Sequence, residues 1–582
     1  MTSTTTGRIQ RVAGPVIEIT GLAGARLNDV VRVGPDALLG EVIRLDRERT
    51  VVQLYESSAG LAVGDTAETT GHPLLVELGP GLLGQVFDGI LRPLELLARD
   101  GDDPHGRPFL PRGAEASSVP RHRRWAFEPL ATVGDRLGPG DPLGKVREGG
   151  LDHLILVPPD RHGELTHLAN GELTVTDPVA HLDGEPVTML SRWPVRKARP
   201  FRKRHDPHVP MITGQRIIDT LFPLARGGAA TIPGGFGTGK TVIEQSLAKW
   251  ADADVVIYVG CGERGNELTE VLDEFPALDD PRTGRSLMER TILIANTSNM
   301  PVAAREASIY TGITLAEYYR DQGLHVAVLA DSTSRWAEAL REVSGRLEEM
   351  PGEEGYPAYL LSRLAGFYER AGLVTCSGRD ARTGSVTIIG AVSPPGGDFS
   401  EPVTQYSLRL AGTFWALDTE LARARHFPAI HYNRSYSLYD LSSSFAERLP
   451  ADHAPMRAWA SRLLQQEEEL MGTVQLLGAD ALSDHERLVL RTGRSLREDF
   501  LQQSSFDPVD AYCSLDKQYW MLWAIHAVHH ARLAALEAKH PLDDTTDRAL
   551  DLDIARLRRH PDAEVPPIAQ AIAQRASGEE AT

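Results

Sequence analysis

The chain has little cysteine: only Cys261, Cys376 and Cys513 occur in 582 residues. Three thiols cannot build a disulfide framework, so we expect the chain to work in a reducing compartment such as the cytoplasm. No apolar run approaches the roughly 18 residues that a membrane-spanning helix needs, and none is predicted. The first residues lack the apolar core of a secretory signal, so we expect no signal peptide.

Positive charge is also scarce, with 61 lysines and arginines against 80 aspartates and glutamates and a formal net charge of −19. A general nucleic-acid binder needs concentrated Lys and Arg to neutralise phosphates, so this balance argues against that class. The exception is segment 193–205, where basic and aromatic residues are interleaved with two prolines. Such a segment could line a single-strand groove, but its prolines favour a linker between domains.

Glycine makes up four of the eight residues of one motif. Residues 234–241 read Gly-Gly-Phe-Gly-Thr-Gly-Lys-Thr, a complete G-x-x-x-x-G-K-[ST] phosphate-binding loop. A β-prone run at 229–232 precedes it and a helix-forming run at 241–250 follows it, as the motif requires. The predicted nucleotide-binding residues of the loop are Gly234, Gly235, Phe236, Gly237, Thr238, Gly239, Lys240 and Thr241.

Within this loop the last two residues carry the chemistry. The side chain of Lys240 is expected to reach the β- and γ-phosphates, and the hydroxyl of Thr241 is expected to bind Mg²⁺. The glycines let the backbone curl around an anion and present several N–H groups to it. The alternative, a glycine-rich turn that fits a loose pattern, does not explain the strand and the helix on either side. The sequence therefore predicts a site for a nucleoside triphosphate.

Two further apolar runs end in acidic residues. The run at 255–260 predicts a buried strand that leads to Glu263 and Arg264, and the run at 324–330 leads to Asp331. Ligands of open α/β sheets sit at the carboxyl ends of strands, so these side chains are expected near the γ-phosphate. Glu263 can polarise an attacking water, and Arg264 can pair with phosphate oxygens or hold that carboxylate. Asp331 is the expected Mg²⁺-organising carboxylate, acting through water.

Each of these turns is weak evidence alone, because a Gly-Glu-Arg-Gly stretch is also a common polar turn and any strand can end in Asp. Three strand ends that converge on one ligand are stronger than any single one. Phosphoryl transfer needs positioning and charge neutralisation more than covalent chemistry. Lys240, Thr241, Glu263, Arg264 and Asp331 together supply those roles, with Lys240, Glu263 and Arg264 as the catalytic candidates.

The pattern of elements divides the chain into several domains, as its length requires. Residues 7–72 alternate β-rich runs with turns, which is typical of a small barrel. Helical and strand patterns alternate from about 210 to 440, which indicates a parallel sheet wrapped by helices. We therefore expect a multidomain α/β protein with an N-terminal β-barrel (1–72), a connector (73–109), a β-rich inserted module (110–200), a P-loop nucleotide-binding ATPase core (201–440) and a C-terminal helical domain with a frayed tail (441–582).

Longer stretches around these motifs carry a family resemblance. They include the stretches at 77–84, 193–196 and 213–223, the stretch Tyr-Val-Gly-Cys-Gly-Glu-Arg-Gly-Asn-Glu at 258–267, the stretch at 330–342, and Pro-Ala-Ile-His-Tyr-Asn-Arg-Ser-Tyr-Ser at 428–437. From about residue 14 to 540 the chain resembles the catalytic A subunits (alpha chains) of the A/V-type rotary ATPases, relatives of the F-type ATP synthases. The β-rich stretch at 110–200 resembles the extra module that separates A subunits from their F-type relatives.

The resemblance implies a RecA-like P-loop core that hydrolyses or synthesises ATP with Mg²⁺. It also implies alternation with non-catalytic B subunits in an A3B3 ring, contacts with central and peripheral stalks, and a separate membrane sector that carries H⁺ or Na⁺. The chain would then lie at the cytoplasmic face of the membrane as a peripheral subunit without a transmembrane segment, and it would bind no nucleic acid. A neighbouring subunit is expected to contribute a transition-state arginine in trans.

The resemblance also assigns residues. The glutamate of the Gly-Glu-Arg-Gly-Asn-Glu stretch activates the hydrolytic water, which gives Glu263. Phe427 resembles the adenine-stacking aromatic, the alternative being a core Phe, and Gln502 and Gln503 resemble glutamines near the adenine edge. The loop departs from the family at Gly235, where Pro is usual, and at Thr238, where Ser is usual. Added glycine makes the free loop more flexible but leaves the amide cradle intact.

Two rival functions stay open. A ring-shaped nucleic-acid translocase can share this core and an N-terminal barrel, although the acidic charge disfavours it. A non-catalytic regulatory protein could bind nucleotide without hydrolysing it, but the intact Lys240 and Glu263 speak against that.

Two other features are expected to be structural, and a third is left open. The helical pair His526 and His530 lacks a third ligand and indicates a packed or exposed helix face rather than a metal site. Cys261 is expected to be a small buried strand-end residue. The loop at 393–400 is either a plain turn or a contact for a moving partner.

Overall fold

The computed structural model describes residues 5–46, 48–94, 112–114, 116–478, 481–542 and 547–578. The predicted connector beyond residue 94 (95–109) and the last four residues lie outside this description. The chain forms two bodies, each described on its own below. The first comprises Met1–Asp206, Ala253–Val392 and Ser400–Leu410, and the second comprises Pro207–Asp252, Ser393–Phe399 and Ala411–Thr582.

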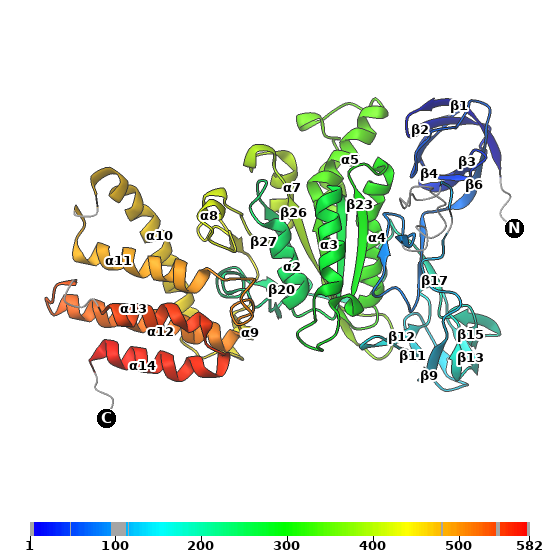
Figure 1. Ribbon diagram of the computed structural model, residues 1–582. Coiled ribbons are helices and arrows are strands. Elements are labelled where there is room, and N and C mark those ends of the chain that lie inside the picture. The colour runs from blue at the N-terminus through cyan, green and yellow to red at the C-terminus, as the bar shows by residue number, and fades with distance from the viewer. Residues whose placement is uncertain are drawn as a thin grey trace. The chain divides into compact units, whose positions relative to one another are not determined.

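The first body begins with a closed six-stranded barrel, as the sequence predicts (Figure 1). Its strand order is β1 (Thr6–Ala13), β2 (Val16–Thr20), β5 (Thr50–Leu54), β4 (Leu38–Leu45), β3 (Asp29–Val33) and β6 (Thr66–Pro73). Successive side chains of a strand point to opposite faces, so alternate residues such as Ile17 and Ile19 fill the barrel and are fully buried. Barrel closure leaves no free sheet edge.

The β-rich insertion follows as two four-stranded sheets. One has the order β10 (Arg136–Leu137), β13 (Gly163–Leu168), β15 (Pro178–Leu182) and β16 (Glu185–Thr188). The other has the order β12 (Leu151–Leu156), β11 (Pro142–Glu148), β9 (Trp125–Pro129) and β14 (Gly171–Leu173). Large side chains such as Trp125 and Phe127 are buried in the module. The predicted β-rich module is therefore confirmed as a fold.

A parallel sheet forms the centre of the first body. Its order is β26 (Thr383–Val392), β24 (His325–Asp331), β22 (Val255–Glu263), β23 (Thr291–Thr297) and β8 (Val86–Phe87). Its helices are α3 (Gly265–Ala277), α4 (Val302–Arg320), α5 (Thr333–Arg346), α6 (Leu360–Tyr368) and α7 (Pro402–Leu410). All residues of α4 are buried, because the helix packs on the sheet and is covered in turn. The strands are continuous apolar runs, as expected for a parallel sheet buried on both faces.

The basic segment 193–205 lies within the first body, where it links two strands that belong to different sheets. It begins in β17 (Ser191–Pro194), which pairs with β7 (Leu75–Leu78), and ends in β18 (Lys203–His205), which pairs with β25 (Gly372–Thr375). Between these strands, Arg196 bonds Glu41 of the barrel (2.7 and 2.8 Å) and Glu306 of α4 (2.9 and 2.6 Å). The guanidinium of Arg196 thus pairs inside the protein instead of meeting solvent.

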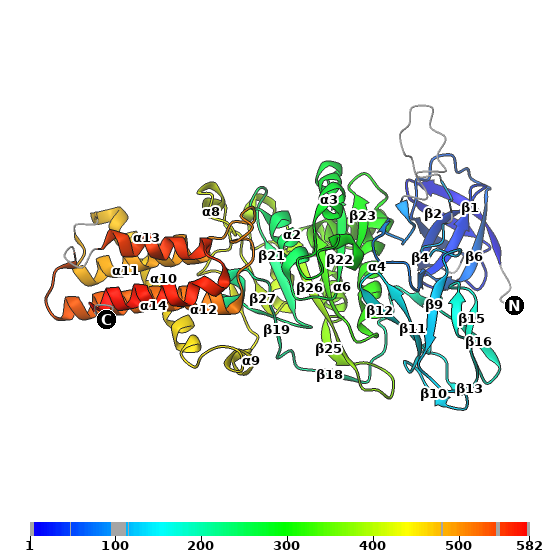
Figure 2. The ribbon, with the colours of Figure 1, turned by 60° about the horizontal axis from the view of Figure 1, so that its bottom comes forward.

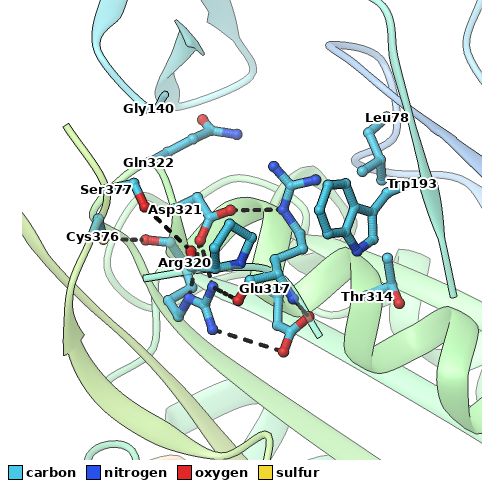
Figure 3. A network of polar contacts seen from close by, with 12 residues as sticks. Leu78, Gly140, Trp193, Thr314, Glu317, Arg320, Asp321, Gln322, Cys376 and Ser377 are labelled. Carbon is cyan, nitrogen blue, oxygen red and sulfur yellow. Dashed lines mark hydrogen bonds and ion pairs between the residues drawn. The ribbon is translucent and has the colours of Figure 1, made fainter. Parts of the chain in front are cut away.

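A second buried network fixes the same segment at the C-terminal end of α4 (Figure 3). Arg199 donates through Nε to Asp321 at 2.6 Å, and Arg320 donates to the other oxygen of Asp321 at 2.6 Å. Glu317 accepts the backbone N–H of Arg199 at 2.9 Å and the guanidinium of Arg370. Because buried charges must be paired, these acids explain why so many arginines are tolerated here.

The second body contains a smaller sheet in which β21 (Ala229–Pro233) is parallel to β27 (Thr413–Phe414), and β27 is antiparallel to β28 (Tyr436–Ser437). β19 (Pro210–Met211) pairs with β20 (Leu224–Ala225). The helix after β21 is α2 (Lys240–Trp250), as predicted. A short α8 (Thr419–Arg423) precedes the family signature stretch.

The C-terminal part of the second body is helical, as predicted (Figure 2). Its main elements are α9 (Ser442–Ala446), α10 (His453–Leu477), α11 (Asp484–Ser495), the π-helix η6 (Leu496–Leu501), α12 (Leu515–Glu537), α13 (Arg548–Arg556) and α14 (Val565–Ser577). The tail was expected to fray, but α14 packs on α12 through Val565, Ala569 and Ile572. None of the helices formed by the described residues has the length and apolar content that crossing a membrane requires.

Candidate nucleotide site

The glycine-rich loop lies between β21 and α2, in the second body. Lys240 folds over the loop, with Nζ donating to the carbonyl of Gly234 at 2.7 Å and to that of Gly235 at 3.2 Å. The α2 N-cap is Gly239, whose backbone is left-handed and offers no side-chain cap. The first amides of α2 therefore keep the anion-binding capacity of a helix N-terminus, with Thr241 in the first turn.

Steric limits explain most of the loop glycines. A Cβ at Gly234 would lie 2.6 Å from Oγ1 of Thr238 and 2.7 Å from Cβ of Leu417. Gly237 and Gly239 have φ values of +76° and +85°, a region that side-chain-bearing residues rarely adopt. Gly235 differs: its φ is not positive, and its Cβ would meet only Cγ2 of Thr419, at 3.6 Å. The glycine that departs from the family is thus the one the backbone does not require.

Phe427 lies beside this loop within the second body. A Cβ at Gly239 would be 3.4 Å from the Phe427 ring, and the ring is 38% exposed, so the alternative of a fully buried core Phe does not describe it. A cavity of about 350 Å³ opens here and is lined by Phe427, Gln502, Gln503 and Val242 of α2. This volume lies in the range of small-ligand pockets. Phosphate loop, aromatic ring and cavity are therefore contiguous on one body.

The two glutamines differ in what their side chains do. Gln503 is buried and its amide is already used: Oε1 accepts the N–H of Arg216 at 2.9 Å, and Nε2 donates to carbonyls of Gly214 and Asp510 at 2.8 Å each. The backbone N–H of Gln503 donates to the carbonyl of Phe427 at 2.8 Å. Gln503 thus holds the cavity wall in place. Gln502 lines the same cavity and donates to a loop carbonyl.

Behind this wall, Arg216 is completely buried. Its guanidinium donates to Asp510 at 2.7 Å, to the carbonyl of Gln502 at 2.7 Å, and to the carbonyl of Phe500. The guanidinium of Arg216 therefore connects the loop that carries Gln502 and Gln503 to the segment of the chain that contains Arg216. Apart from the family-like stretch that contains Arg216, no pattern in the sequence indicated this role.

The acidic candidates lie in the first body. β22 and β24 are parallel neighbours in which Gly260 pairs with Asp331, so Glu263 and Asp331 end at the same sheet edge. Asp331 is buried and accepts a hydrogen bond from the hydroxyl of Tyr258 at 3.2 Å. Arg264 is exposed at the N-cap of α3. The predicted convergence of these two strand ends is confirmed within this body.

The environment of Glu263 favours its neutral form. Burial raises the pKa of Glu263 to about 9, helped by the negative charges of Asp331 and Glu267 and by a hydrogen bond with Glu267. The guanidinium of Arg335 acts in the opposite direction and lowers that pKa. A carboxyl group with a raised pKa is a stronger base than an exposed one, and added positive charge would favour its ionised form while lowering that pKa.

Glycine is also required at the turn that carries Glu263. Gly262 has a φ of +74°, and a Cβ there would lie 2.8 Å from Cδ and Nε of Arg305 and 3.0 Å from Cβ of Arg335. Arg305 donates to the carbonyl of Ser298 at 2.7 Å. The turn is therefore pressed against two arginines that the sequence analysis did not assign.

Glu267, Arg305 and Arg335 are the site residues that sequence reasoning missed. Glu267 and Arg335 each lie four residues after an acidic strand end, in the first turn of the helix that follows the strand, so proximity in the sequence could have indicated both. Arg305 lies on another element, and no local signal pointed to it.

Cys261 and the two helical histidines have packed surroundings. Cys261 is fully buried, and burial raises the pKa of its thiol to about 12. His526 and His530 pack against each other and against Trp459. Among the described residues, no group of three or more His, Cys, Asp or Glu side chains is placed to hold a metal ion.

Family models match the chain in four consecutive segments. They describe the beta-barrel domain of the ATP synthase alpha/beta family (residues 9–71), the ATP synthase alpha/beta subunit barrel-sandwich domain (116–196), the nucleotide-binding domain of that family (214–437) and the C-terminal domain of V and A type ATP synthase (442–545). The fold and the phosphate loop thus define a nucleotide-binding protein of the ATP synthase alpha/beta class.

Individual relatives narrow the class. The chain is 58% identical over 561 residues to the second A subunit of the A-type ATP synthase of Methanospirillum hungatei, a match that covers 96% of this chain and 95% of that protein. It is 55% identical to the A subunit of the A-type ATP synthase of Methanopyrus kandleri and 55% identical to the V-type ATP synthase alpha chain of Anaeromyxobacter sp., each over 97% of this chain and 96–97% of the relative. The chain belongs to the family of A-type ATP synthase A subunits and V-type ATP synthase alpha chains.

Proposed function

We propose that this chain is the catalytic subunit of an A/V-type rotary ATPase and that it hydrolyses or synthesises ATP. The observation that carries the proposal is the phosphate loop, with a helix N-terminus that no side chain caps and an adjoining cavity, in a chain of this family. Water attacks the γ-phosphate in line, or the reverse occurs during synthesis. The acidic net charge and the family disfavour a nucleic-acid translocase.

The residues take distinct roles in this reaction. The loop amides and Lys240 bind the phosphates and neutralise their charge, and Glu263 orients the attacking water and accepts its proton. Arg264 pairs with phosphate oxygens. Phe427 stacks on the adenine, and Gln502 lies near its edge.

Mg²⁺ suits the donors available on each body, a hydroxyl in the first turn of α2 and a carboxylate at the end of β24, because hard cations prefer oxygen ligands. Thr241 would hold the ion directly and Asp331 through water. When bound, it would offset phosphate charge.

The assembly follows from the family. We propose alternation with non-catalytic B subunits in an A3B3 ring, with stalk subunits and a membrane sector that carries H⁺ or Na⁺. The chain then lies at the cytoplasmic face of the membrane as a peripheral subunit. The neighbouring subunit supplies an arginine in trans, so the isolated chain binds ATP but turns it over slowly.

The test is Glu263→Gln, which keeps the size of the side chain but removes its basicity. In the assembled complex we expect nucleotide affinity to stay within about twofold and turnover to fall by about 10²- to 10⁴-fold, the usual contribution of a general base. Steady-state hydrolysis and equilibrium binding of Mg·ADP measure the two effects. Glu289→Gln, an exposed carboxylate on the same body, serves as the matched control. Unchanged turnover in Glu263→Gln would refute the assigned role.

A further inference from the structure

A short helical turn near the C-terminus contributes to the cavity beside Phe427. This turn is η8 (Leu557–Arg559), which directly follows α13, and Arg558 and Arg559 both line the cavity. It lies beyond residue 545, where the last of the matched family segments ends. The roles proposed above for the phosphate loop and for Phe427 do not use these two arginines.

The backbone of η8 is fixed from its buried side. Leu557 is fully buried, and Lys517 in the first turn of α12 is only 1% exposed. The ammonium of Lys517 donates to the carbonyl of Arg558 at 3.1 Å and to that of His560 at 2.8 Å. A buried charge is costly unless it is hydrogen-bonded, so both bonds are strongly favoured. Because the two carbonyls flank Arg559, the backbone of this residue is held in one place.

The side chains of the two arginines have different surroundings. Arg558 is half-buried and donates through Nη1 to the carbonyl of Glu498 at 3.2 Å, which joins the turn to η6. Arg559 is exposed, and its guanidinium forms no hydrogen bond or ion pair with any residue that the structure describes. Its N–H donors are therefore accessible to a molecule in the cavity.

Two carboxylates belong to the same cavity wall, and both have other partners. Asp510 pairs with Arg216 at 2.7 Å. Asp507 accepts the backbone N–H of Val509 at 2.9 Å, and this bond lowers its pKa, with a further contribution from the positive charge of Arg559. Asp507 is therefore ionised at neutral pH. An ionised carboxylate repels a phosphate group but not an uncharged nucleoside, so this wall suits the nucleoside end of a nucleotide.

We propose that Arg559 binds the nucleoside end of the nucleotide, an inference that rests on the proposed function. None of the phosphate-loop residues 234–241 lines this cavity, so Arg559 lies on the wall that receives the base and the ribose. These groups carry ring nitrogens and oxygens that accept hydrogen bonds, and a guanidinium carries only donors, in a planar fork. Lys517 is the positioning residue that holds Arg559 at the wall.

The test is Arg559→Gln in the full chain, with calorimetric titration of Mg·ADP. We expect the Kd to rise about five- to thirtyfold, the loss of a hydrogen bond from a charged donor. Mg·pyrophosphate, which carries phosphates without a nucleoside, should bind both proteins equally. Arg556→Gln removes an exposed arginine of α13 outside the cavity wall and serves as the control for long-range charge. The melting temperature of Arg559→Gln should not change, because the side chain is exposed.

A double-mutant cycle tests the positioning role. Lys517→Met should also weaken binding of Mg·ADP, because it releases the backbone on both sides of Arg559. If Lys517 acts through Arg559, the double variant should bind no more weakly than the weaker single variant. Additive losses would refute this positioning role.

The remaining outcomes separate the inference from the proposed function. An equal Kd of Mg·ADP for Arg559→Gln and the unaltered chain would overturn the inference alone. A loss of the same size for Mg·pyrophosphate, or in Arg556→Gln, would also overturn it, because Arg559 would then act only through its charge. Absence of Mg·ADP binding to the unaltered chain would overturn the proposed function, and this inference with it.

Discussion

The buried pair of Arg216 and Asp510 leads to the sharpest prediction about the nucleotide cavity. Arg216→Met removes a guanidinium that is fully buried and leaves the carboxylate of Asp510 with only the backbone N–H of Ser504, at 2.8 Å, as a donor among the described residues. Breaking a buried pair by removing one partner costs about 3–5 kcal/mol. For a body of this size that corresponds to a fall in melting temperature of about 6–20 °C.

The same change should weaken nucleotide binding, because Arg216 bonds the side chain of Gln503 and Gln503 bonds the backbone of Phe427. We expect a higher Kd for Mg·ADP and, in the assembled complex, a raised KM with little change in kcat. Thermal denaturation followed by circular dichroism and calorimetric titration of the nucleotide measure the two effects.

A double-mutant cycle provides the control. Asp510→Asn removes the charge of Asp510 but keeps its acceptor for Ser504, so Arg216→Met combined with Asp510→Asn should cost less than the sum of the two single changes. Additive costs, or a single Arg216→Met variant within about 1 kcal/mol of the unaltered chain, would refute the reasoning.

Two further predictions concern the loop and the helical part. Gly234→Ala places a Cβ against Thr238 and Leu417, so we expect it to weaken nucleotide binding at least about tenfold. The Cβ of Gly235→Ala has space, so this variant should bind nucleotide within about twofold of the unaltered chain in the same titration. Equal effects of the two changes would contradict the steric explanation. The pKa of His529 is lowered from 6.5 to about 4 by burial, so the unfolded chain takes up a proton first as the pH falls through 6.5. The free energy of unfolding is therefore not reduced by this histidine above pH 6.5. At pH 5, protonation of His529 in the unfolded chain lowers the free energy of unfolding by about 2 kcal/mol. In urea unfolding, His529→Gln should reduce the fall in the free energy of unfolding between pH 7.5 and 5. An unchanged dependence of that free energy on pH would count against the burial of this ring.

The acidic strand ends were predictable because the physics there is local. Apolar runs that end in polar residues form buried strands of a parallel sheet, and parallel neighbours bring their carboxyl ends to one edge. Glu263 and Asp331 were found in this way. The phosphate loop was predictable for the same reason, since its glycines and the following helix are contiguous in sequence.

The features that were not predicted depend on contacts between residues that are far apart in the sequence. The pairing of Arg196 and Arg199 was not predicted, because their partners Glu306 and Asp321 lie more than 100 residues away in the sequence. Helix α14 was missed because its apolar residues become a buried face only when α12 is present. Arg305 was missed because its role depends on a close approach to Gly262, which no local pattern encodes.

The position of Arg196 has a mechanical consequence. Its guanidinium joins the rim of the N-terminal barrel to α4, and the residue before its partner Glu306 is Arg305, which presses on the turn of Glu263. A twist of the barrel against the sheet would have to separate a half-buried guanidinium from two carboxylates at once. Displacing Glu306 would therefore also displace the adjacent Arg305, which lies against the turn of Glu263.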